Sequence, residues 1–159
     1  MTIKVGDRIP SVKLFEQGAD GPQAISSDDI FKGKTVALFG VPGAFTRTCS
    51  EKHLPGFVSQ AEAIKSKGVD AIVCIAANDP PVMAAWGMAH GTDGKVRMIS
   101  DGCLEFTQSA GLDVDLSSRG YGVRCKRFSM IVKDGAVTHM HMENGGFGET
   151  SAETLLKDL

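Results

Sequence analysis

One cysteine, Cys49, stands where the chain is able to build a sulfur nucleophile. It follows the apolar run 35–41, which is typical of a strand buried on both faces, and it opens a stretch with a helical pattern. The first turn of a helix has unpaired backbone N–H groups and the positive end of the helix dipole, and both stabilise a thiolate. Cysteines in such places titrate at about 3.5–7.5 instead of about 8.5. We therefore predict a reactive thiolate; the alternative is an inert buried cysteine.

Several neighbours have side chains that would support this thiolate. Thr46 precedes Cys49 by three residues, so its hydroxyl shares the same turn, as a binding group or as a helix cap. His53 follows by four residues, on the same helix face, where it tunes the thiolate or makes a local hydrogen bond. Pro42 has no N–H and shields the sulfur from water. An arginine would stabilise the negative charge, and the residues alone leave three open: Arg119, Arg124 and Arg127.

The elements that must position these residues alternate between strand and helix along the chain. Apolar runs predict strands at 35–41, 69–76, 95–100 and 127–132, and helices are expected at 49–67, 80–90, 104–110 and from 150 onward. This order indicates an α/β fold with parallel central strands. Asp134-Gly135 predicts a hairpin. In its second strand, alternation places Val137, His139 and His141 on one face and Thr138, Met140 and Met142 on the other.

Helix ends are expected at residues with capping side chains. Thr48 and Glu51 are spaced as a capping box, or Thr46 caps the same helix, and either choice keeps Cys49 in the first turn. Pro55 lacks a backbone donor and is expected to kink this helix. Asp79 is expected to cap the helix that begins at Pro80. The spacing Thr150-x-x-Glu153 predicts the cap of the last helix.

Composition limits the classes of function. The chain has 159 residues, of which 42% are hydrophobic and 23% charged, so we expect a single domain over residues 1–159. The net charge of −2 and the scattered basic residues give no footprint for nucleic acid or an anionic membrane. No apolar run approaches the length of a membrane helix, and the first ten residues are polar and mixed, so we expect a cytoplasmic protein.

The four cysteines form no C-x-x-C pair, which argues against a zinc knuckle and against a dithiol oxidoreductase. His139 and His141 share one strand face, yet the spacing suggests no third ligand, so no metal site is expected.

The spacing of Pro42, Thr46 and Cys49 matches P-x-x-x-T-x-x-C, and the match continues in other segments: His53-Leu54-Pro55-Gly56-Phe57, Asn78-Asp79, Lys126-Arg127-Phe128-Ser129-Met130 and Ser151 to Leu156. The chain resembles the peroxiredoxins, and within them the type II branch of plant and bacterial proteins that includes mammalian peroxiredoxin five. The resemblance covers nearly the whole chain. It departs at Arg47, where this branch commonly has proline. It implies a thioredoxin-like fold, a central mixed sheet flanked by helices.

The resemblance also implies an activity. It is the thiol-dependent reduction of hydrogen peroxide and alkyl hydroperoxides, through a sulfenic acid on Cys49 and with no cofactor. The family's arginine precedes the segment that Phe128-Ser129 matches, which selects Arg127; a structural ion pair is the alternative. Arg47 is expected to point to solvent. A homodimer formed near the active-site loops is implied as well.

Turnover requires a second thiol. Cys74 is the internal candidate, because parallel strands would place it near the same sheet edge as Cys49, although it is also a plausible small core residue. Otherwise glutathione with glutaredoxin, or thioredoxin, reduces Cys49 directly. Cys103 and Cys125 are expected to be incidental. A redox sensor or holdase on the same fold, which records oxidation without turning over, is the alternative function.

Overall fold

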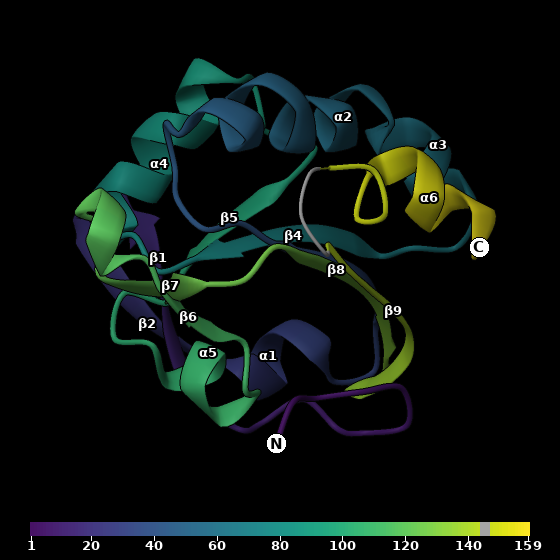
Figure 1. Cartoon of the computed structure of the whole chain (residues 1–159). Helices are drawn as coiled ribbons and strands as arrows, with labels where there is room; N and C mark the ends of the chain where they lie inside the picture. The colour runs from purple at the N-terminus through teal and green to yellow at the C-terminus, as the bar shows by residue number, and fades with distance from the viewer. Residues whose placement is uncertain (144–146) are drawn as a thin grey trace.

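The structure is a computed structural model and describes residues 1–143 and 147–159. In these residues seven strands form one mixed sheet in the order β2-β1-β5-β4-β3-β8-β9, and two more form a small separate sheet (Figure 1). The neighbouring pairs β3–β4 and β4–β5 are parallel, and the other neighbouring pairs of this sheet are antiparallel. The strands are β1 (Lys13–Gly18), β2 (Gly21–Ser26), β3 (Thr35–Gly40), β4 (Ala71–Ala76), β5 (Arg97–Ser100), β6 (Asp113–Asp115), β7 (Val123–Cys125), β8 (Phe128–Lys133) and β9 (Ala136–Met142).

Helices cover both faces of the large sheet. Figure 1 shows α2, α3, α4 and α6 over one face and α1 and α5 over the other. A buried apolar cluster lies on each side, one containing Phe57 and Trp86, the other Phe31 and Phe106. The helices are α1 (Ser27–Phe31), α2 (Leu54–Ser59), α3 (Ala61–Ser66), α4 (Pro80–Ala89), α5 (Glu105–Ser109) and α6 (Ala152–Lys157), with a π-helical turn over Cys49–His53 and a 3₁₀ turn over Ser117–Arg119.

Several sequence predictions are confirmed. The mixed sheet flanked by helices is present, and β3 pairs in parallel with β4 so that Phe39 stands beside Cys74. Asp79 caps α4 by accepting a hydrogen bond from the Val82 N–H at 2.9 Å. At the hairpin, Asp134 and Gly135 both have positive φ, as the tight turn between β8 and β9 requires.

Other expectations are wrong in detail. β1, β2 and α1, which begin the fold, were not predicted from the sequence. The single helix expected over 49–67 is three pieces: the π turn, α2 and α3. The last helix is capped by Ser151, which accepts the Thr154 N–H at 3.2 Å, so the expected cap at Thr150 lies one residue too early. The hydroxyl of Thr150 donates a hydrogen bond to Glu143 instead.

A β-bulge changes the faces of β9. The register shifts between Ile131 and Val132, so that Val132 pairs with Val137 and Ile131 with His139. The extra residue breaks the alternation that was expected along the strand. Val137 therefore packs into the same apolar cluster as Met140 and Met142, whereas the sequence had placed it with the histidines.

Candidate active site

The turn that carries Cys49 begins directly after the loop that leaves β3. The first helical hydrogen bond runs from the Ser50 N–H to the Thr46 carbonyl at 2.9 Å, and Cys49 has no exposed surface. The Thr46 hydroxyl donates to the Gly43 carbonyl at 2.7 Å, and Thr48 makes no side-chain cap. Neither expected cap is therefore formed. Cys49 nevertheless lies in the first turn, as predicted.

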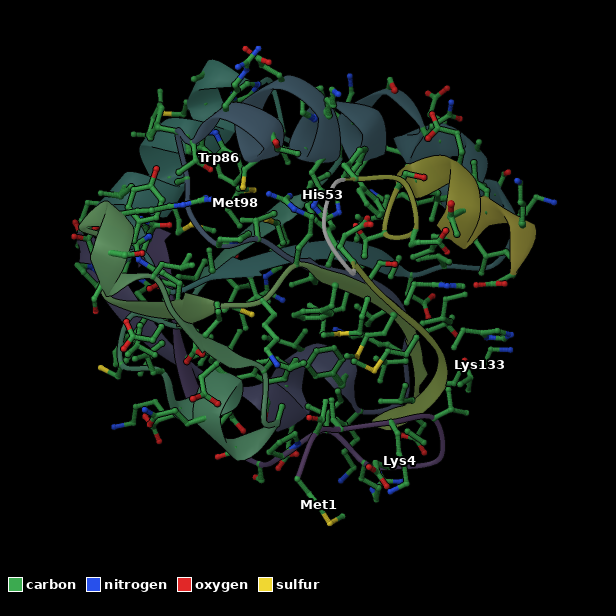
Figure 2. All side chains as sticks on the ribbon, viewed as in Figure 1. Met1, Lys4, His53, Trp86, Met98 and Lys133 are labelled. Carbon is green, nitrogen blue, oxygen red and sulfur yellow. The ribbon has the colours of Figure 1, made fainter. Side chains whose placement is uncertain are left out.

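The π-helical turn has a local cause. Pro55 has no N–H to donate back to the preceding turn, and the Leu54 N–H bonds to the Cys49 carbonyl, five residues earlier. The kink expected at Pro55 thus takes the form of a wider turn just before it. Trp86 of α4 donates its indole N–H to the Ser50 hydroxyl at 3.0 Å, which ties the turn to the neighbouring helix. Figure 2 shows His53 and Trp86 in the layer between the sheet and the helices.

A guanidinium lies against the sulfur. Arg127 directly precedes β8, and β8 is the antiparallel neighbour of β3, with Phe128 opposite Gly40. This pairing brings Arg127 to the end of β3 where the Cys49 turn starts. Its Nη2–H donates to Cys49 Sγ at 3.0 Å. Among the three arginines left open by the residues, the geometry brings Arg127 to the sulfur.

The other cations near the loop have different partners. Arg124 donates from Nη1 to the Pro42 carbonyl at 3.2 Å and from Nε to the Tyr121 carbonyl at 2.9 Å, so it braces the loop before Cys49. Arg47 has a side chain that is 88% exposed and contacts Glu51 at 3.5 Å. Its expected position in solvent is confirmed, and such exposed pairs contribute little.

His53 is buried between Arg127 and the C-terminal loop. Its Nδ1 lies 2.8 Å from Arg127 Nη1 and its Nε2 lies 3.0 Å from the Thr150 carbonyl. Arginine is only a donor and a carbonyl is only an acceptor, so the ring proton must be on Nε2. Burial, and next the charge of Arg127, lower the pKa of His53 to about 3. The imidazole is therefore neutral at physiological pH and accepts a hydrogen bond from Arg127.

The lowered pKa of His53 couples folding to pH. Histidine titrates near 6.5 in the unfolded chain and at about 3 here, so between these values the unfolded state binds the additional proton. The stabilisation is complete above the unfolded pKa and is lost as the pH falls below it. We expect this group to lower the free energy of unfolding by about 2 kcal/mol between about pH 7 and pH 5. Urea denaturation of the wild type and of His53→Gln measures it, and equal pH dependence in the two would contradict the assignment.

The remaining cysteines lie in different surroundings. Cys74 is fully buried in β4, and burial, followed by the proximity of Cys49 and Cys125, raises its pKa well above the ordinary value. Cys125 is buried in β7, where desolvation raises its pKa to about 12. Cys103 is exposed.

Two contacts next to the site were not predicted from the sequence. The Thr150 carbonyl contacts His53, and Glu143 holds Thr150 by accepting its hydroxyl at 2.6 Å and its N–H at 2.8 Å. The hairpin at Asp134-Gly135 brings the end of β9 near Arg127, but the bulge that places Glu143 opposite Arg127 has no sequence signal, and the cap expected at Thr150 concealed the second contact.

Residues 1–143 and 147–159 contain no group of three or more potential metal ligands. None of the helices in these two ranges is long and apolar enough to cross a bilayer.

Comparison with known proteins identifies the family. A family model described as Redoxin matches residues 4–156. The chain is 46% identical to Peroxiredoxin-2D of Arabidopsis thaliana over 160 residues, which cover 99% of this chain and 98% of the relative. It is 44% identical to the chloroplastic Peroxiredoxin-2E-2 of Oryza sativa subsp. japonica over 164 residues, covering 99% of this chain and 73% of that one.

A solved structure supports the same family. Reduced Prx3 from Vibrio vulnificus, in complex with H₂O₂, superposes with a TM-score of 0.95 at 39% identity, covering 99% of both chains. The thioredoxin-like, single-domain fold that the sequence predicted is confirmed by this likeness. The chain therefore belongs to the type II peroxiredoxins within the Redoxin family, and it is a thiol-dependent peroxidase.

Proposed function

We propose that Cys49 is the nucleophile of this peroxidase. The observation that carries the proposal is the hydrogen bond from Arg127 Nη2 to Cys49 Sγ at 3.0 Å in a buried setting. A fixed guanidinium at this distance stabilises negative charge on the sulfur. The thiolate attacks one peroxide oxygen, the O–O bond breaks, and its electron pair leaves on the second oxygen, which takes a proton. Cys49 becomes a sulfenic acid, and water or an alcohol is released.

The neighbouring residues would divide the remaining work. Arg127 also stabilises the negative charge that develops on the departing oxygen. The Thr46 hydroxyl donates its hydrogen bond to the Gly43 carbonyl. Its lone pairs therefore remain available to accept a hydrogen bond from the peroxide O–H. Pro42 limits the access of water. His53 is neutral, so its role is to orient Arg127 and not to transfer protons.

Hydrogen peroxide and small alkyl hydroperoxides are the proposed substrates. Because Cys49 has no exposed surface, the sulfur is suited to a small oxidant. The similar Prx3 of Vibrio vulnificus was solved with H₂O₂.

The resolving thiol must reach a buried sulfenic acid. The Cys49 turn has to open for this, which breaks the contact of Arg127 with Cys49 and that of Trp86 with Ser50. Cys74 must in addition ionise, against its raised pKa, because only the thiolate attacks. We therefore propose that an external thiol, glutathione with glutaredoxin or thioredoxin, resolves Cys49 faster than Cys74 does.

Non-reducing peptide mapping after one equivalent of peroxide tests this order. Without another thiol, we expect slow formation of a Cys49–Cys74 disulfide. With millimolar glutathione, we expect a glutathione adduct on Cys49 and sustained turnover with glutaredoxin, in the wild type and in Cys74→Ser alike. Loss of turnover in Cys74→Ser would make Cys74 the obligatory resolving thiol. A protein oxidised once at Cys49 that no reductant recycles would instead be a redox sensor or holdase.

We also propose a homodimer that covers the face beside the site. Phe45, Tyr121 and Val123 are large apolar residues that are 58%, 38% and 39% exposed, and Phe45 has a φ of 63°. Phe45 and the pair Tyr121 and Val123 lie on two segments that Arg124 links, and large exposed apolar residues beside a strained backbone are typical of an interface. Sedimentation velocity tests it, since a monomer at all concentrations would contradict the proposal.

A cytoplasmic location is proposed because turnover consumes thiols that the cytosol keeps reduced. Some of the similar plant proteins are chloroplastic, so fractionation of native cells is the test.

A further inference from the structure

A short loop beside the site, residues 147–150, is held by a single carboxylate. One oxygen of Glu143, Oε2, accepts the Gly148 N–H at 3.0 Å, the Thr150 N–H at 2.8 Å and the Thr150 hydroxyl at 2.6 Å. Burial alone would raise the pKa of Glu143, but the hydrogen bonds from this loop outweigh it and hold the pKa below the ordinary value. The anchor is therefore an ionised carboxylate with charge-assisted hydrogen bonds.

Thr150 connects this anchor to the site. The residue is fully buried, and while its N–H and hydroxyl bind Glu143, its carbonyl accepts the His53 Nε2–H at 3.0 Å. Phe147, from the same loop, packs edge-on against His53 with ring centres 5.2 Å apart, and the Arg127 guanidinium lies 5.9 Å from the Phe147 ring centre. The loop thus contacts both groups that stand behind Cys49.

The hairpin fixes the anchor relative to the arginine. Glu143 directly follows β9 and Arg127 directly precedes β8, and the Glu143 N–H bonds to the Arg127 carbonyl at 3.4 Å. One pair of cross-strand neighbours therefore presents a cation to Cys49 and an anion to the loop that supports His53.

We propose that Glu143 is a positioning residue of the peroxidase, acting on Cys49 through Thr150, His53 and Arg127. This inference rests on the proposed roles of Cys49 and Arg127. The carboxylate holds the Thr150 carbonyl where it fixes the His53 proton on Nε2. Without that acceptor the Nε2–H tautomer loses part of its stabilisation, and the fraction of rings with the proton on Nδ1, facing the Nη1 donor of Arg127, increases. Two opposed donors repel, so the guanidinium turns away from the sulfur.

The test compares Glu143→Gln with a matched control, Asp158→Asn. Asp158 also ties the C-terminal segment to β9, through His141 at 2.6 Å, but it touches neither Thr150 nor His53. In Glu143→Gln, ¹⁵N NMR of the histidine rings is expected to show His53 changing from the Nε2–H tautomer toward a mixture. Alkylation of Cys49 by iodoacetamide at a fixed pH is expected to slow, and peroxide reduction to slow by on the order of tenfold. Asp158→Asn is expected to change none of these.

A double mutant separates positioning from general loosening. If Glu143 acts through His53, adding Glu143→Gln to His53→Gln slows alkylation no further, whereas independent effects would add. An unchanged His53 tautomer in Glu143→Gln, or equal changes in Asp158→Asn, would overturn the proposal. The tautomer is measured without peroxide, so it is informative even if Cys49 proved not to be the nucleophile. Circular dichroism confirms that each variant is folded.

Discussion

Replacing Cys49 by serine is expected to lower the rate of hydrogen peroxide reduction by at least about 10³-fold, to the background of the buffer. The substitution changes one atom and keeps the shape of a fully buried side chain. The serine hydroxyl at this place stays protonated at neutral pH. Its oxygen cannot form an intermediate equivalent to the sulfenic acid of a cysteine. Stopped-flow measurement of peroxide consumption under single-turnover conditions is the direct assay.

The exposed cysteine offers a matched control for Cys49→Ser. Cys103→Ser makes the same chemical change at the surface and is expected to retain full activity. Unchanged peroxide consumption in a folded Cys49→Ser protein would end the assignment of the nucleophile. Activity lost equally in both variants would point to Cys103 as a participant.

Replacing Arg127 by glutamine is expected to slow peroxide reduction by about 10²–10³-fold, the usual cost of removing one fixed donor at a developing negative charge. The guanidinium bonds the sulfur with one nitrogen and His53 with the other, so its two contacts are lost together. Lysine restores the charge without the rigid fork, so Arg127→Lys is expected to recover only part of the rate. Single-turnover rates across pH separate the lost charge from the lost geometry.

Arg47→Gln is the control for the arginine. Arg47 is the cation nearest to Cys49 in sequence, yet its side chain is 88% exposed, so this variant is expected to change the rate less than about twofold. A larger effect of Arg47 than of Arg127 would show that proximity in sequence, and not the contact in the fold, governs the thiolate.

The position of the proposed nucleophile could be predicted because it depends on local chemistry. An apolar strand followed by a helix start defines where Cys49 lies, and both elements are confirmed. The π turn could not be predicted, since it depends on the missing N–H of Pro55 together with the tertiary hydrogen bond from Trp86 to Ser50. The arginine also required more than the residues: spacing left three open, and only the pairing of β8 with β3 brings Arg127 to the sulfur.

The contacts that hold His53 through Thr150 and Glu143 could not be predicted, for a different reason. Thr150 has the spacing of a helix cap, and local propensity assigns its hydroxyl to the last helix. In the fold Ser151 takes that place, and Thr150 is left free to bind Glu143. A shift of one residue at a helix end is small for the fold but decides what the site is built from.

The bulge in β9, the strand at the edge of the large sheet, determines which residue lies opposite Arg127. Counted outward from Asp134-Gly135 without it, Met142 would stand across from Arg127; the additional residue moves Glu143 there instead. A thioether is a weak acceptor and carries no charge, so it would not hold Gly148 and Thr150. One inserted residue in an outer strand thus exchanges an apolar neighbour of the arginine for an anion, and a deletion there would alter the site without touching any residue that contacts the sulfur.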